Sequence, residues 1–69
     1  VAATMLAEAA GLDVSRGVTW IAERIEGGSY VRAFNGGGRS AVFDGPPTDA
    51  ADPRAILAAV LVAVLGVAS

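Results

Sequence analysis

The sequence predicts a small α+β domain in which two helices precede a β-hairpin and an apolar helix closes the chain. Three observations lead to this order. The chain opens with an alanine-rich segment that ends at Gly11, and two β-type segments flank a glycine-rich turn at 35–38. The third observation is a run of fourteen residues, 55–68, without a polar side chain.

The first helix is predicted over 2–10. This segment combines alanine with methionine, leucine and glutamate, which all favour helix. Gly11 suits the left-handed backbone that commonly ends a helix, because glycine has no Cβ. Asp13 or Ser15 then offers a side-chain oxygen that can cap a second helix.

The second helix is predicted over about 15–26. Four apolar residues are spaced four, three and four apart, which places them on one helical face: Val14, Val18, Ile21 and Ile25. The alternative is a strand, because Val18 to Ile21 is β-branched and aromatic. A strand would change the order to helix, three-stranded meander and helix.

A β-hairpin is predicted next. Residues 29–34 alternate and include aromatic side chains, 35–38 (Asn-Gly-Gly-Gly) form a strong turn sequence, and 39–43 return. The sequence Asp44-Gly45-Pro46-Pro47 then ends the hairpin.

The last helix is predicted to begin after Asp52, whose carboxylate can cap it, with Pro53 at the first helical position. It runs to about Leu65, where Gly66 ends it. The chain is therefore one domain, with a helix–turn–helix plus hairpin over 1–47 and the apolar helix over 48–69.

The composition excludes several kinds of chemistry. The chain has no histidine and no cysteine, so it lacks the usual general base, zinc ligand and thiolate. The triple glycine lacks the lysine and hydroxyl residue of a phosphate loop, and the aspartates at 44, 49 and 52 do not follow calcium-loop spacing. We therefore expect no enzymatic activity, no cofactor and no bound metal.

The apolar tail indicates a protein partner. A helix that is apolar on every side must be covered, and a 69-residue chain has little surface with which to cover it. A membrane span takes about 20 apolar residues, so the run is short for that role. We expect a homo-oligomer or a larger protein assembly, located in the cytoplasm or within a protein particle. The expected interface residues are Ile56, Leu57, Val60, Leu61, Val64 and Leu65.

More than half of the chain resembles a known family. Residues 6–13, Ser15, 18–26 and 30–32 are similar to the winged helix–turn–helix of MarR-type regulators, and 35–42 is similar to the wing of that family. The resemblance implies a winged-helix-like fold that binds duplex DNA as an oligomer, through the 15–26 helix and the 35–39 wing.

The resemblance also implies particular DNA contacts. The first side chains of a recognition helix face base edges in the major groove, where an arginine can form two hydrogen bonds to guanine. Arginines further along would hold phosphates, and the glycine turn would approach the DNA backbone closely. The implied contact residues are Ser15, Arg16, Thr19, Arg24, Arg32, Gly37 and Arg39. Segment 13–39 carries four arginines against three acids, although the whole chain has a net charge of −2.

An assembly subunit is the competing hypothesis. In that case the protein is a small structural component, for example of a phage-like particle or a homo-oligomer, and the apolar C-terminal helix is its interface. The small size and the overall acidity favour this hypothesis. The conformation of 15–26 distinguishes the two hypotheses. A DNA-binding regulator needs a helix there, and a strand would exclude the regulator hypothesis.

Overall fold

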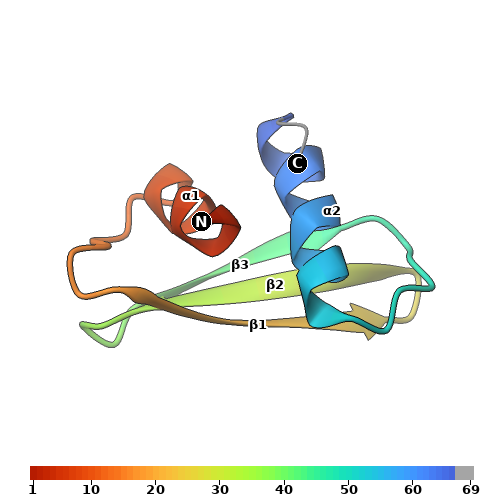
Figure 1. Ribbon diagram of the computed structural model, residues 1–69, viewed down its shortest axis with the longest axis horizontal. Coiled ribbons are helices and arrows are strands. Elements are labelled where there is room, and N and C mark those ends of the chain that lie inside the picture. Colours follow the sequence, from red (N-terminus) through yellow and green to blue (C-terminus); the bar gives the residue numbers. More distant parts are fainter. Residues whose placement is uncertain (67–69) are drawn as a thin grey trace.

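The protein folds as two helices on one face of a three-stranded antiparallel sheet (Figure 1). The computed structural model describes residues 1–66. Its elements, in chain order, are α1 (Ala2–Ala9), β1 (Val18–Ile25), β2 (Gly28–Asn35), β3 (Ser40–Gly45) and α2 (Pro53–Leu65). The strands follow one another in the order β1-β2-β3, so the sheet is a simple meander.

The predicted order of helix, helix, hairpin and helix is wrong, and the meander alternative describes the structure. Most of the segment expected as a second helix, 15–26, is the edge strand β1. Alternate side chains point to opposite faces of a strand: Val18, Trp20 and Ala22 pack toward the helices, whereas Ile21 remains exposed on the other face. The apparent helical stripe was therefore a coincidence of spacing, and the β-branched and aromatic residues of the segment are compatible with the strand that forms.

A glycine makes the first turn of the sheet possible, and an asparagine side chain stabilises the second. Ile25 pairs with Gly28, so only Glu26 and Gly27 connect β1 to β2, and Gly27 has a φ of +80°. The predicted turn at 35–38 joins β2 to β3. There the side-chain oxygen of Asn35 accepts hydrogen bonds from the backbone N–H groups of Gly37 (3.0 Å) and Arg39 (2.9 Å). These bonds satisfy donors that a tight turn would otherwise leave exposed to solvent alone.

Helix α2 begins and ends where the sequence predicts. The carboxylate of Asp52 accepts a hydrogen bond from the N–H of Arg54 at 2.9 Å, and Pro53 occupies the first turn. Gly66 adopts the left-handed conformation (φ +68°) and donates its N–H to Val62 O at 2.8 Å. Val67 and Ala68, the last residues of the apolar run, lie outside the described residues. Within residues 1–66, neither helix combines the length and the hydrophobicity that crossing a lipid bilayer requires.

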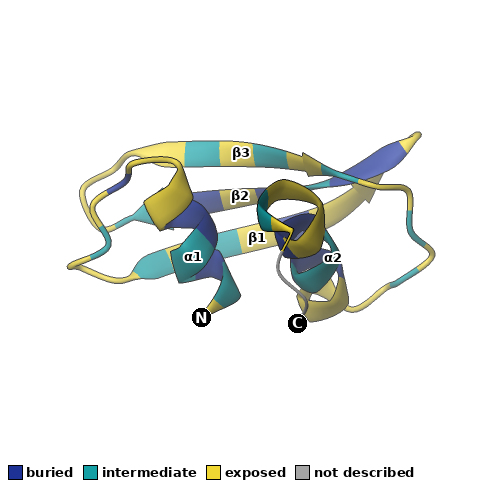
Figure 2. Ribbon diagram, turned by 90° about the horizontal axis from the view of Figure 1, so that it is seen from above, coloured by how far each residue is buried: buried dark blue, intermediate teal, exposed yellow. Residues whose placement is uncertain are grey.

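The core lies between the two helices and the sheet. Leu6 of α1, Val31 of β2 and Val60 of α2 are fully buried at its centre. Figure 2 shows the buried residues on the sides of α1 and α2 that face the sheet and each other. A second, smaller cluster joins Ala7, Leu12 and Ala33 near the α1 end of the sheet.

Four of the residues expected at an intermolecular interface belong to this core. Ile56, Leu57, Val60 and Leu61 are at most 7% exposed, and they pack on the chain's own sheet and on α1. The sequence prediction underestimated how much cover the chain provides for α2, because it assigned no sheet to 18–25. The apolar surface that remains uncovered lies further along the helix.

Candidate functional site

The C-terminal end of α2 is the main apolar surface that the helix layer leaves exposed. The helix rises away from the sheet, so its first turns contact the strands and its last turn extends beyond them (Figure 1). The buried residues of α2 accordingly stop at Leu61. In the last turn Val62 is 44% exposed and Val64 is 40% exposed, while Leu65 still packs partly against the core.

This surface is chemically uniform. After Arg54 no residue of α2 has a polar side chain, and the outward positions before the last turn are alanines. A surface helix ordinarily presents charged or polar groups to solvent. We refer to Val62, Ala63 and Val64 as the α2 tip. Of the six expected interface residues, Val64 lies in the tip and Leu65 lies beside it.

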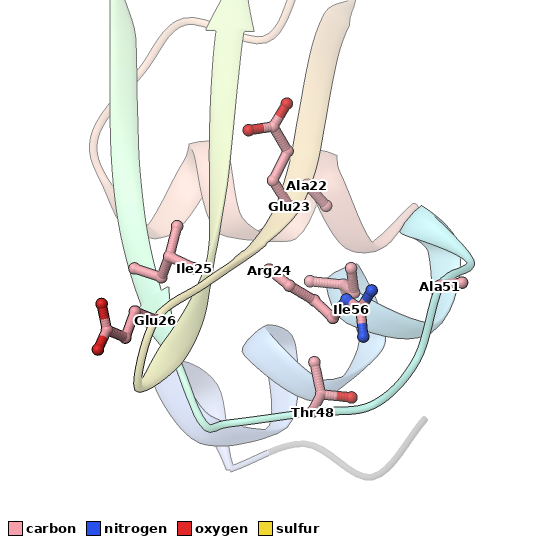
Figure 3. Close-up of a pocket in the computed structure, with 8 residues that line it drawn as sticks. All are labelled: Ala22, Glu23, Arg24, Ile25, Glu26, Thr48, Ala51 and Ile56. Atoms are coloured by element: carbon pink, nitrogen blue, oxygen red, sulfur yellow. The ribbon is translucent and has the colours of Figure 1, made fainter.

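A shallow hollow of about 640 Å³ lies between the end of β1 and the loop at 46–52 (Figure 3). Arg24 extends across it toward Ile56, and its guanidinium donates a long hydrogen bond (3.4 Å) to the backbone oxygen of Asp49. Thr48 and Ala51 border the hollow, whereas Glu23, Ile25 and Glu26 point away from its centre. Arg24 thus links β1 to the loop, and the described residues that line the hollow include no nucleophile paired with a base.

The residues implied as DNA contacts do not form one surface. Ser15 and Arg16 lie in the loop before β1, and Gly37 and Arg39 lie in the β2–β3 turn at the same end of the sheet. Thr19 and Arg32 lie on the sheet face opposite the helices. Arg24 lies on the helix side at the other end, in the hollow. The recognition helix on which this set depends is β1, so the resemblance to a winged helix does not extend to the fold.

Charge is distributed unevenly along the 32 Å length of the molecule. The end with the β1–β2 turn and the 46–52 loop has a net charge of −3, from Glu23, Glu26, Asp44, Asp49 and Asp52 against Arg24 and Arg54. The remainder has a net charge of +1, from Arg16, Arg32 and Arg39 against Glu8 and Asp13. This separation favours a partner of opposite polarity and opposes a uniformly charged one.

Two hydrogen bonds on the surface each shift the pKa of one titratable side chain. The hydroxyl of Tyr30 donates to Glu23 Oε2 at 2.7 Å, and this bond raises the pKa of Tyr30, with desolvation and the charge of Glu23 adding to the effect. Asp13 accepts a hydrogen bond from the N–H of Ser15 at 2.9 Å, which lowers the pKa of that carboxyl. Both groups are exposed, so neither bond by itself indicates a catalytic site.

The described residues contain no group of three acidic side chains placed to hold a metal ion. Their one buried serine, Ser29, donates its hydroxyl to the backbone oxygen of Pro46 at 2.8 Å and so fastens the end of β3 to β2. Its role there is structural.

The exposed face of the sheet was not predicted from the sequence. Glu23, Tyr30, Val42 and Asp44 received no role there, and Ile21 was assigned to a helical stripe. The signal available in the sequence was the β-branched and aromatic character of 18–21, on which the strand alternative was based. The chain matches no family model, no curated protein and no solved structure.

Proposed function

We propose that this protein is a non-enzymatic structural subunit that associates with copies of itself through the α2 tip. The observation that carries the proposal is an exposed helix end in which every outward side chain is apolar. Val62 and Val64 together keep enough hydrocarbon in water that covering them on association is favourable, by about 25 cal/mol for each Å² buried. The lack of histidine and cysteine supports a role without catalysis.

Binding to duplex DNA has less support. The segment expected as the recognition helix is a strand. The arginines expected to contact DNA lie on different parts of the surface, and the molecule is acidic overall. Counterion release, the main source of affinity for DNA, needs several cations that can reach phosphates together. Arg16 and Arg39 are the pair that comes closest to this arrangement, at the turn end of the sheet.

The test is the mass of the particle in solution, measured by light scattering after size-exclusion chromatography over a wide range of concentrations. We expect the wild-type protein to exceed the monomer mass as concentration rises. The Val62→Lys and Val64→Lys variants should remain smaller at every concentration. Lysine in the last turn of a helix interacts favourably with the helix dipole, so these variants should keep their fold.

Ala9→Lys is the matched control, because Ala9 is exposed in the last turn of α1 and receives the same charge. It should associate as the wild type does. Circular dichroism must show the same helix and strand content for all variants. Lysine variants of the α2 tip that remain folded and retain the wild-type mass distribution would refute the proposal.

A further inference from the structure

No segment within residues 1–66 covers the sheet face opposite the helices. Neither helix contacts it (Figure 1), and it carries three large aliphatic side chains that are half exposed: Ile21 (42%), Ile25 (50%) and Val42 (52%). We call this surface the open face. Alternation along the strands assigns to it Thr19, Ile21, Glu23, Ile25, Tyr30, Arg32, Phe34, Ser40, Val42 and Asp44.

Strand register arranges this face in rows. Ile21, Arg32 and Val42 lie side by side across the three strands, so one cation is flanked by two aliphatic side chains. The next row consists of Glu23, Tyr30 and Asp44, so two anions flank a tyrosine. The positive row and the negative row are therefore adjacent and occupy the middle of the face.

Two copies can stack these faces about a twofold axis that runs either across the strands or parallel to them. The charge pattern is complementary to itself for the first of these two axes. A twofold axis that crosses the strands, between the two rows, places the positive row of each copy over the negative row of the other. Arg32 then lies over Tyr30 of the second copy, between its Glu23 and Asp44, and the contact occurs twice. The guanidinium is long enough to reach either carboxylate from that position.

The other dyad is excluded by charge. An axis parallel to the strands would place Arg32 over Arg32 of the second copy and Glu23 over its Asp44. Like charges brought together at an interface are repulsive and suppress wrong arrangements. The first dyad also brings Ile25 at one end of the face beside Thr19 and Phe34 of the second copy, which covers an aliphatic side chain that is 50% exposed.

Single-stranded nucleic acid is the competing occupant. Tyr30, Arg32 and Phe34 are successive outward residues of the central strand, and exposed aromatic residues with a cation are the usual platform for stacked bases. The two carboxylates argue against it, because the face carries Glu23 and Asp44 against one arginine and would repel phosphates. In addition, the Tyr30 hydroxyl is already bonded to Glu23 at 2.7 Å.

The size of the face sets the strength of pairing. With about 3.3 Å per residue and about 4.8 Å between strands, three strands of this length span roughly 26 by 14 Å. That footprint is below the size of a stable protein–protein interface, so pairing should be weak and strongly dependent on concentration.

We propose that the open face is a second self-association surface, on which two copies stack their sheets about the dyad that crosses the strands and pair Arg32 with Glu23 and Asp44. It lies on the opposite side of the sheet from the α2 tip and does not depend on the tip. A subunit that uses both surfaces can extend beyond a dimer, as an assembly component requires.

Charge reversal tests this proposal in the full chain. Arg32→Glu should weaken pairing at least about tenfold, because it places three acids on each face. A variant that combines Arg32→Glu with Glu23→Arg and Asp44→Arg should restore pairing, since the reversed pattern is again self-complementary. Arg39→Glu, in the β2–β3 turn, makes the same charge change off the face and should leave pairing unchanged. Sedimentation velocity over a concentration series measures all four proteins.

Each outcome decides the proposal. Wild-type pairing in a folded Arg32→Glu protein would overturn it, and so would a folded triple variant that fails to pair. Binding of a single-stranded oligonucleotide that is lost in Arg32→Glu, with no pairing of the protein alone, would instead assign the face to nucleic acid. In the Val62→Lys background the Arg32 effect should persist, so failure of the α2 tip and failure of the open face are distinguishable.

Discussion

At the scale of single residues, the informative side chains are those with a specific hydrogen bond. Tyr30 is the only tyrosine of the chain, and its bond to Glu23 stabilises the protonated phenol next to a negative charge. The raised pKa of Tyr30 therefore reports whether this contact of the open face is formed. Ser29, by contrast, is buried and contributes a bond that closes the end of the sheet.

The Tyr30 contact predicts a particular alkaline titration. Because the folded-state pKa is raised, the contact contributes stability that is complete below the unfolded value of about 10 and is lost as pH rises through the folded value. Absorbance of the phenolate should show a midpoint above about 10 in the wild type. Glu23→Ala should move the midpoint down toward that value, and Glu26→Ala, in the β1–β2 turn, should not. An unchanged midpoint in Glu23→Ala would show that the bond is not formed in solution.

At the scale of elements, the contact between α2 and β3 depends on a missing side chain. A Cβ built on Gly45 would lie 2.5 Å from Cγ2 of Val60 and 2.7 Å from Oγ of Ser29. Val60 is itself fully buried, so it has no free space into which to move. The close approach of helix and strand is therefore possible only because position 45 is glycine.

Gly45→Ala should reduce the free energy of unfolding by about 1–3 kcal/mol through overpacking. Val60→Ala removes the methyl groups that the new Cβ would meet, so the two substitutions together should cost less than the sum of their separate effects. Gly37→Ala is the control, because a Cβ there meets nothing closer than 3.5 Å and the turn is exposed. Urea denaturation of the four variants measures the coupling. Strict additivity would contradict the described packing.

At the scale of the whole molecule, one apolar helix serves two purposes. Its first turns complete the core of a small domain, and its last turn leaves the α2 tip exposed. The open face lies on the other side of the sheet, and its charges run in the same direction as the polarity of the whole molecule. In the proposed assembly, association therefore depends on residues other than those of the core, which makes folding and association separable by mutation.

Leu61→Ala should affect folding rather than association. This side chain is 5% exposed between α2 and the sheet, and removing it should cost about 2–5 kcal/mol of stability. A small domain has little stability to lose, so the midpoint of thermal unfolding should fall clearly, while any protein that remains folded should associate as the wild type does. A folded, fully stable Leu61→Ala protein with altered mass would show instead that Leu61 belongs to an interface.

Local chemistry in the sequence determined the helices and turns whose ends are marked by capping or turn residues. The alanine-rich helix that ends before Gly11, the turn at 35–38 and the Asp52-Pro53 start of α2 are all predicted correctly, because capping and turn formation depend on neighbours along the chain. The same local signals could not decide 18–25, where apolar residues fit both a helical stripe and an alternating strand.

Only the tertiary structure decided that segment and the surfaces that depend on it. Pairing with β2 satisfies the backbone groups of β1 that face β2, and packing under the helices turns Val18, Trp20 and Ala22 toward the core. That choice fixed which half of α2 is covered and which is left as the tip. It also placed Arg32 in the row next to that of Glu23 and Asp44, an arrangement that is a property of strand register and of no local pattern.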